Sequence, residues 1–268
     1  MKRLGVIILL VLGLFLLFLP GCGKSSVEQE ITIAGSTSVQ PLSEVLAEAF
    51  MEANPGYKVS VQGGGSSVGI EQVANGTVDI GSSSRELKPE EKELGLKEIV
   101  IARDGIAVIV HPSNKVEDLT LEQIRGIFAG RITNWKDVGG EDGKIVVINR
   151  ESGSGTRGAF EEIVMDGEEL VESIEQSSNG AVRAAVASDP KAIGYVSLTA
   201  LSSDVKPLKV NGVSPTPQNI KDGKYPIARP FLYLLKGEPS DAVKAYLDFI
   251  KSEKARKIIE EEGVIPVN

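Results

Sequence analysis

One local order recurs along the chain: a β-prone run, a turn of glycine and hydroxyl residues, and then a helix. The turns are Gly-Ser-Thr-Ser at 35–38, Gly-Gly-Gly-Ser-Ser at 63–67 and Ser-Gly-Ser-Gly-Thr at 152–156. After the first turn, a helix that begins near Pro41 carries apolar side chains on one face. Strands that alternate with helices are typical of an α/β fold with a mostly parallel sheet. This order therefore predicts that fold class.

The pattern changes at residues 99–110, where two apolar runs flank Arg103-Asp104-Gly105. We interpret the run at 106–110 as a crossing into a second lobe and the run at 231–235 as a strand returning to the first. This predicts a first lobe of residues 27–105 and 227–268, a second lobe of residues 106–226, and a hinge of two crossing segments. The other expected strands lie at 31–34, 57–61, 78–81, 144–148 and 193–196. Helices are expected after the turn at 63–67 as far as residue 73, at 121–128 and at 156–165, with an irregular stretch at 213–226 and a last helix capped by Ser240.

The three turns have the composition of an anion site. The first backbone N–H groups of a helix have no partner within the helix, and the helix dipole places partial positive charge there. Glycine lets the backbone approach a ligand, and serine or threonine adds a rotatable O–H donor. A single turn of this kind is more simply read as a helix cap. Three such turns, with a fourth hydroxyl run at 82–84, exceed what capping requires.

The overall charge bears on what such a site can hold. The chain has 37 acidic and 29 basic residues and a net charge of -8. A nucleic-acid-binding surface is normally basic, so DNA and RNA are not expected partners. An anion must therefore be held by local dipoles and by selected cations. Arg150 stands just before the turn at 152–156, and its planar fork of donors suits an oxyanion.

The N-terminal residues 1–22 have the pattern of a secretory signal. Lys2 and Arg3 precede an uncharged apolar run at 4–19, and Leu-Pro-Gly-Cys follows at 19–22. This ending resembles a bacterial lipobox, which predicts lipid attachment at Cys22 and an extracytoplasmic location on the cell membrane, in the periplasm or at the outer surface. An uncleaved anchor or an ordinary signal are the alternatives. Since Cys22 and His111 are the only cysteine and histidine, we expect no disulfide within the chain and no Cys/His metal site.

Four segments in this order are similar to the phosphate-binding proteins of bacterial and archaeal phosphate-specific ABC transporters. They are Ala-Gly-Ser-Thr-Ser-Val-Gln-Pro at 34–41, Gln-Gly-Gly-Gly-Ser-Ser at 62–67, Val-Asp-Ile-Gly-Ser-Ser-Ser at 78–84 and Arg-Glu-Ser-Gly-Ser-Gly-Thr at 150–156. The resemblance implies a two-lobed periplasmic-binding-protein fold of type II that closes on one phosphate ion. It implies phosphate contacts from Thr37, Ser38, Ser66 and Ser84 in the first lobe and from Arg150, Ser154, Gly155 and Thr156 in the second.

Ser84 departs from the family pattern, in which an aspartate accepts the proton of monohydrogen phosphate and repels sulfate. A serine both accepts and donates, so another tetrahedral oxyanion such as sulfate, molybdate or tungstate remains the alternative ligand. Arg85 either adds a second cation to the site or lies at the surface. Asp79 either replaces the missing acceptor or pairs with nearby backbone.

An enzyme is not expected. The segment 64–69 has glycines at P-loop spacing, but Ile70 stands where the loop needs lysine. A serine hydrolase needs a general base, and His111 is far in sequence from Ser154. We therefore expect a monomer that needs no cofactor or metal and that delivers phosphate to the permease subunits of an ABC importer. A surface protein that has kept the fold and lost transport is a third possibility.

Overall fold

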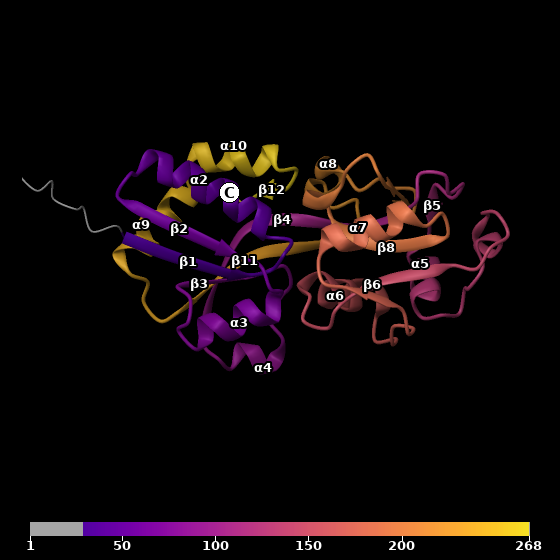
Figure 1. Ribbon diagram of the computed structural model, residues 1–268, viewed down its shortest axis with the longest axis horizontal. Coiled ribbons are helices and arrows are strands. Elements are labelled where there is room, and N and C mark those ends of the chain that lie inside the picture. The colour runs from indigo at the N-terminus through magenta and orange to yellow at the C-terminus, as the bar shows by residue number, and fades with distance from the viewer. Residues whose placement is uncertain (1–28, 268) are drawn as a thin grey trace, which may run out of the picture.

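The computed structural model describes residues 29–267, and the signal segment with Cys22 lies outside them. The molecule is elongated and has two lobes joined side by side (Figure 1). We call the part built on β1–β3, α2–α4, α9 and α10 the first lobe, and the part built on β5–β10 and α5–α8 the second lobe. Within residues 29–267, every helix is too short or too polar to cross a membrane.

The first lobe is built on a sheet in the order β2-β1-β3-β11-β4. β1 pairs in parallel with both β2 and β3, whereas β11 runs antiparallel to β3 and β4. The parallel strands therefore all end at the same edge of the sheet. The bounds are β1 Gln29–Gly35, β2 Tyr57–Gln62, β3 Ile80–Ser83, β11 Ala228–Lys236, β12 Ile265–Pro266, α2 Gln40–Ala53, α3 Ser66–Ala74, α4 Pro89–Lys92, α9 Asp241–Ile250 and α10 Glu253–Glu261.

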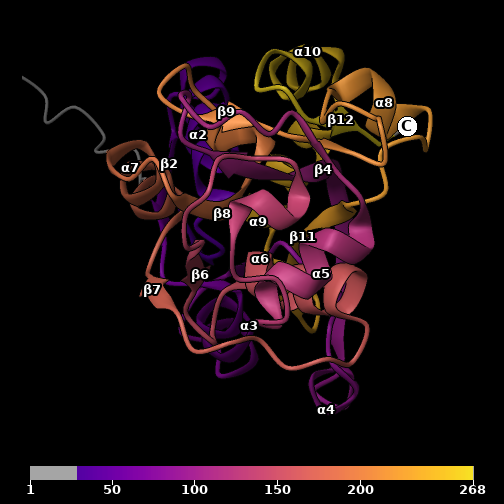
Figure 2. The same ribbon diagram turned by 90° about the vertical axis from the view of Figure 1, so that its right-hand side faces the viewer.

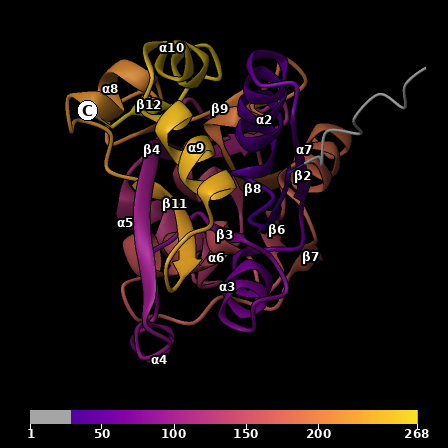
Figure 3. The same cartoon turned by 90° about the vertical axis from the view of Figure 1, so that its left-hand side faces the viewer.

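Helices cover both faces of this sheet. The alternation of side chains along β11 shows why, because Phe231 and Tyr233 pack into one core with α2, α9 and α10, while Leu232 and Leu234 pack into another with α3. Figure 3 shows α9 lying across the sheet on one side and α3 on the other. The two-sided burial explains why the strand is apolar at nearly every position.

Two long strands connect the lobes. β4, Leu96–Val110, pairs with β11 up to Gly105 and then with β8 from Ile106 onward. Its residues therefore belong first to the core of the first lobe and then to the core of the second. The two apolar runs at 99–110 form one continuous strand, because Arg103-Asp104-Gly105 stays extended between them.

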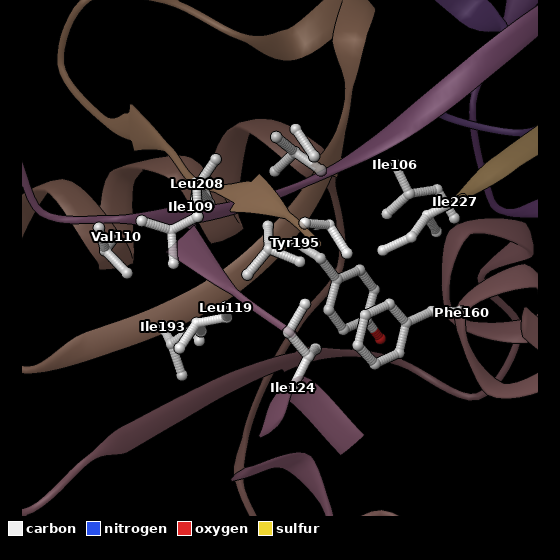
Figure 4. Packing of buried hydrophobic residues seen from close by; sticks show 14 of the residues in the cluster. Ile106, Ile109, Val110, Leu119, Ile124, Phe160, Ile193, Tyr195, Leu208 and Ile227 are labelled. Carbon is white, nitrogen blue, oxygen red and sulfur yellow. The ribbon is translucent and has the colours of Figure 1, made fainter. Parts of the chain in front are cut away.

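The second lobe continues the sheet in the order β4-β8-β6-β7, with β6 parallel to β7 and β8. Phe160 stacks on Tyr195 with ring centroids 4.0 Å apart (Figure 4). Phe128 meets Phe160 edge-on. Figure 2 views this lobe end-on. The bounds are β5 Asp118–Leu119, β6 Val146–Arg150, β7 Ile174–Gln176, β8 Ala192–Ser197, β9 Lys206–Pro207, β10 Lys209–Val210, α5 Leu121–Phe128, α6 Gly155–Phe160, α7 Asn179–Ser188, α8 Pro217–Lys221, two 3₁₀ turns at Trp135–Val138 and Leu198–Ala200, and a π-helical turn at Glu161–Met165.

The structure confirms the predicted fold class and most of the predicted elements. The expected helix at 156–165 is α6 together with the π-helical turn that follows it. Other elements correct the prediction: the helices α4, α7 and α10 and the short strands β5, β7, β9, β10 and β12 were not expected, and α8 lies in the stretch predicted to be irregular. α8 forms because Thr216 caps it by accepting from the N–H of Asn219, with Pro217 at the first position, where its missing N–H leaves no bond unmade.

Candidate anion-binding site

The polar turns of both lobes meet where the lobes face each other. Each follows the carboxyl end of a parallel strand, the edge at which ligands bind in open α/β sheets. The turns after β1, β2 and β3 come from the first lobe, and the turn after β6 comes from the second. The amino-acid sequence thus predicted the contributing segments, and the topology brings them together.

Glycine makes the close approach of the first-lobe turns possible. Gly35 has a φ of +139°, and an added Cβ would lie 2.2 Å from the carbonyl oxygen of Ser82. Gly65 has a φ of +100° and donates its N–H to the carbonyl of Gly35 at 2.9 Å. Both conformations are disfavoured for residues with a side chain. These glycines therefore hold the β1, β2 and β3 turns against one another.

The first-lobe hydroxyls form a connected set. The Ser36 hydroxyl donates to Ser84 Oγ at 2.8 Å, and Ser66 Oγ accepts from the backbone N–H of Ser84 at 3.1 Å. Ser36, Ser38, Ser66 and Ser84 are all buried. The set lies directly under the second lobe, because a Cβ on Gly155 would be 2.1 Å from Ser66 Oγ and 2.6 Å from Ser84 Oγ.

Arg150 is the cation of the site and is only 1 % exposed. Its Nε and Nη2 donate to the Glu151 carboxylate at 3.1 and 2.9 Å, and Nη2 also lies 3.2 Å from Thr37 Oγ1 in the first lobe. Its Nη1 is buried and has no hydrogen-bond partner within residues 29–267. A buried donor without an acceptor costs about 1–3 kcal/mol, and more when the group is charged. The guanidinium is therefore held in place on one edge while Nη1 keeps its hydrogens for a further acceptor.

Several hydrogen bonds join the lobes at the site. Ser38 Oγ and Thr156 Oγ1 are 2.8 Å apart, and the N–H of Ser67 donates to the carbonyl of Gly153 at 3.2 Å. Thr199 Oγ1 lies 3.3 Å from the carbonyl oxygen of Ser38, which it can reach as a donor. These contacts describe a closed arrangement of the two lobes.

The eight expected ligand residues belong to the turns that meet here, and seven of them lie in or beside the network described above. The seven are Thr37, Ser38, Ser66, Ser84, Arg150, Gly155 and Thr156. The Ser154 side chain accepts from the N–H of Arg157 at 3.3 Å and caps α6, which occupies one lone pair and leaves its hydroxyl hydrogen free within the described residues. Capping, the simpler interpretation of a single turn, thus applies to this hydroxyl.

Asn179 joins the same network and was missed from the sequence. It is 4 % exposed, donates from Nδ2 to Ser38 Oγ at 2.9 Å and accepts from the N–H of Ser197 at 3.1 Å. The signal was present, since Ser-Ser-Asn-Gly at 177–180 follows the short strand β7 and opens α7. It escaped notice because three residues of strand give too weak a pattern to mark the turn.

A buried ion pair at the crossing strands was also missed. Arg229 on β11 donates from Nε and Nη2 to Asp104 Oδ2 on β4 at 3.0 and 2.9 Å. Arg229 Nη1 donates to the carbonyl of Ser84 at 3.1 Å, and Asp104 accepts from the Ser197 hydroxyl at 2.9 Å. Burial raises the pKa of the Asp104 carboxyl, and Arg229 and Ser197 oppose that rise. This pair therefore links the crossing strands β4 and β11 to Ser84 of the first lobe and to Ser197 of the second.

Arg85 and Asp79 have structural partners. Arg85 is 4 % exposed, which corrects the surface alternative, and its guanidinium donates to both oxygens of Glu91 at 2.6 and 2.8 Å. It also lies 3.2 Å from Ser67 Oγ, which places it beside the site with its charge already matched. Asp79 accepts from the N–H and hydroxyl of Thr32 at 2.8 and 2.7 Å, as the backbone-pairing alternative predicted. Residues 29–267 contain no cluster of histidine, cysteine and carboxylate side chains that could hold a metal ion.

Two α/β lobes joined by crossing strands, with buried donors gathered where they meet, define a solute-binding protein. Residues 23–254 match the model of the PBP superfamily domain. The whole chain is 36 % identical to the phosphate-binding protein PstS of Bacillus subtilis and covers 95 % of it, and it is 32 % identical to PstS of Borreliella burgdorferi and covers 99 % of it. The chain therefore belongs to the PBP superfamily, in the family of the phosphate-binding proteins PstS.

Solved structures agree with this assignment. A phosphate ABC transporter substrate-binding protein with bound phosphate from Clostridium perfringens is 45 % identical, with a TM-score of 0.87 over 90 % of this chain and 100 % of that one. An ABC-type phosphate transport receptor from Vibrio cholerae is 38 % identical, with a TM-score of 0.76 over 88 % of this chain and 100 % of that one.

Proposed function

We propose that the chain captures inorganic phosphate between its two lobes and delivers it to the permease of an ABC importer. The observation that carries the proposal is the buried Arg150 guanidinium, whose Nη1 has no partner within residues 29–267 while its Nη2 lies 3.2 Å from the Thr37 hydroxyl of the opposite lobe. A small oxyanion supplies acceptors for a guanidinium and for several O–H and N–H donors at once. The phosphate-binding relatives named above support an ABC importer as the partner.

The proposed ligand set is Thr37, Ser38, Ser66, Ser84, Arg150, Ser154, Gly155 and Thr156, and Ser154 also caps α6. Donors from both lobes favour a mechanism in which the ligand stabilises the closed form, because only that form brings all of them to one guest. The role is binding, without catalysis and without a cofactor. The permease then recognises the closed shape.

We further propose that residues 27–105 with 227–268, and residues 106–226, act as the two moving bodies. Separate hydrophobic cores support this division: the first lobe has one around β1, α2 and α9 and a smaller one around α3, and the second lobe has its own around β6, β8 and α7. We propose that lipid on Cys22 anchors a monomer to the outer side of the cell membrane, on the evidence of the signal pattern in residues 1–22.

Calorimetric titration of the full chain, purified in detergent, tests the ligand. Phosphate and arsenate should bind with one site per chain, and Arg150→Ala should abolish most of the heat. Incubation with a chromogenic phosphate ester tests the absence of catalysis. A chain that binds no phosphate, or that turns over the ester, would contradict the proposal. Mass analysis of the N-terminal peptide after expression with its own signal tests the lipid on Cys22.

A further inference from the structure

The serine hydroxyls of the first lobe have defined donor directions. Ser36 Oγ accepts from the backbone N–H groups of Ser38 and Val39 at 3.2 and 3.4 Å. A hydroxyl has two lone pairs and one hydrogen, so these two bonds occupy both lone pairs of Ser36. Its hydrogen therefore goes to Ser84 Oγ at 2.8 Å. Ser66 Oγ likewise accepts from the N–H of Ser84 at 3.1 Å.

The other two first-lobe hydroxyls are also acceptors toward the protein. The N–H of Ser197 donates to Asn179 Oδ1 at 3.1 Å, which fixes the orientation of that amide, so Nδ2 is the atom that donates to Ser38 Oγ at 2.9 Å. Thr37 Oγ1 lies 3.2 Å from Arg150 Nη2, and an arginine can only donate. The hydroxyls of Thr37, Ser38, Ser66 and Ser84 thus each accept a hydrogen from the protein. Thr37, Ser66 and Ser84 keep their own hydrogens for a guest. The Ser38 and Thr156 hydroxyls are 2.8 Å apart and share one hydrogen bond, so one of their two hydrogens is also left for a guest.

Each carboxylate near these hydroxyls is already paired with an arginine. Glu151 is bound by Nε and Nη2 of Arg150, on the side of the guanidinium away from Nη1. Glu91 is bound by Arg85. The Asp104 carboxylate is bound by Arg229 of β11, which also donates to the carbonyl of Ser84.

We propose that the site selects oxyanions by their protonation state, binding dianionic phosphate in preference to monoanionic phosphate and accepting sulfate as a competing ligand. The inference rests on the proposed function and names the form of the ligand. Where the guest oxygen carries a proton, a donor of the site faces a second hydrogen. A hydroxyl must then turn a free lone pair to the guest and withdraw its own hydrogen. Ser84 can do so, because within residues 29–267 its oxygen accepts only from Ser36. Each proton on the guest therefore removes about one donated hydrogen bond, which weakens binding by about tenfold.

Titration of the full chain in detergent with inorganic phosphate, from about pH 5.5 to about pH 8.5, tests this directly, because phosphate changes from monoanion to dianion in that range. The phosphate affinity should fall by about tenfold toward the acidic end. Sulfate carries no proton throughout, so it should displace phosphate with an affinity that stays constant with pH. A constant sulfate affinity shows that titration of the protein's own groups does not cause the change in phosphate affinity.

Four outcomes separate the two proposals. A phosphate affinity that stays level with pH overturns the inference, as does failure of sulfate to displace phosphate or a sulfate affinity that falls in parallel with that of phosphate. In each of these cases phosphate capture still stands. Absence of phosphate binding at every pH overturns phosphate capture itself.

Substitution at Ser84 gives a second test. Ser84→Asp introduces a carboxylate acceptor beside Gly155 and should weaken sulfate binding by at least about a hundredfold while levelling the phosphate pH profile. Ser84→Asn has a similar volume and no charge, and it should weaken both ligands to a similar degree. Equal effects of the two substitutions on sulfate would refute the inference. The pH profile of the unsubstituted chain decides the matter independently if either variant fails to fold.

Discussion

Closure of the lobes depends on the absence of a side chain at Gly155. An alanine Cβ there would lie 2.1 Å from Ser66 Oγ, 2.9 Å from Ser66 Cβ and 2.6 Å from Ser84 Oγ, all in the opposite lobe. Gly155 does not have positive φ, so alanine fits its backbone and the collision is the main effect. Gly153, two residues earlier in the same turn, is a matched control, because its added Cβ would meet nothing nearer than Ser67 Cβ at 3.9 Å.

The magnitude follows from these distances. Relief of the contact with Ser66 from 2.1 Å to an ordinary 3.4 Å requires the lobes to separate locally by the difference, about 1.3 Å. The Ser38–Thr156 contact would then lengthen from 2.8 Å to about 4.1 Å, beyond hydrogen-bonding distance. The interlobe bond from Asn179 to Ser38 would be lost in the same way. Loss of two to three such bonds at about 1 kcal/mol each gives about 2–3 kcal/mol, or about 30- to 150-fold weaker phosphate binding.

Calorimetry with phosphate on Gly155→Ala and Gly153→Ala measures the effect, and thermal unfolding without ligand verifies that both variants fold. Gly153→Ala should bind within about threefold of the unsubstituted chain. Small-angle scattering should show that phosphate compacts the Gly153→Ala protein but not the Gly155→Ala protein. Equal affinities for the two variants would refute the argument that closure over Gly155 contributes to binding.

Three further predictions concern the charged groups. Arg150→Lys should weaken phosphate binding by about 2–5 kcal/mol by titration despite the retained charge, because an ammonium cannot replace the fork, and unchanged affinity would remove the arginine from the site. Asp104→Ala should lower the free energy of unfolding in denaturant by about 3–5 kcal/mol, since Arg229 would be buried without its partner, and a loss under 1 kcal/mol would contradict this. Burial raises the pKa of Glu91, but the hydrogen bonds from Arg85 and from the Lys88 backbone, together with the positive charges of both residues, outweigh it and lower the pKa from its ordinary value of 4.5. Glu91 therefore stabilises the fold above about pH 4.5 and loses this effect as the pH falls through the lowered pKa, so the stability difference between the unsubstituted chain and Glu91→Gln should shrink in acid.

Much of the fold was predictable because local patterns decide it. The strands β1, β2 and β8 and the helices α2, α5 and α9 lie where hydrophobic periodicity and turn residues predicted them. The elements that were missed have weak local signals. α10 follows α9 after only two residues, so its cap at Ser252 was not recognised, and β7 is three residues long.

The site divides in the same way. Arg150 and the hydroxyl turns were found because their composition exceeds what a cap needs. The partners of these groups were not found: Arg229 is 125 residues from Asp104 and Asn179 is 141 residues from Ser38. No local pattern relates residues so far apart, since only the packed sheet places them together.

The sequence by itself determined the α/β class, the turns that supply donors and the arginine among them, because each depends on residues close together in the chain. The tertiary structure decided which hydroxyls face one another, that Ser154 caps a helix, and in which direction Ser36 and Asn179 donate. The physical reason is that a hydroxyl group is donor and acceptor at once. Its role is set by the neighbours that occupy its lone pairs, and here most of those neighbours come from other elements of the fold.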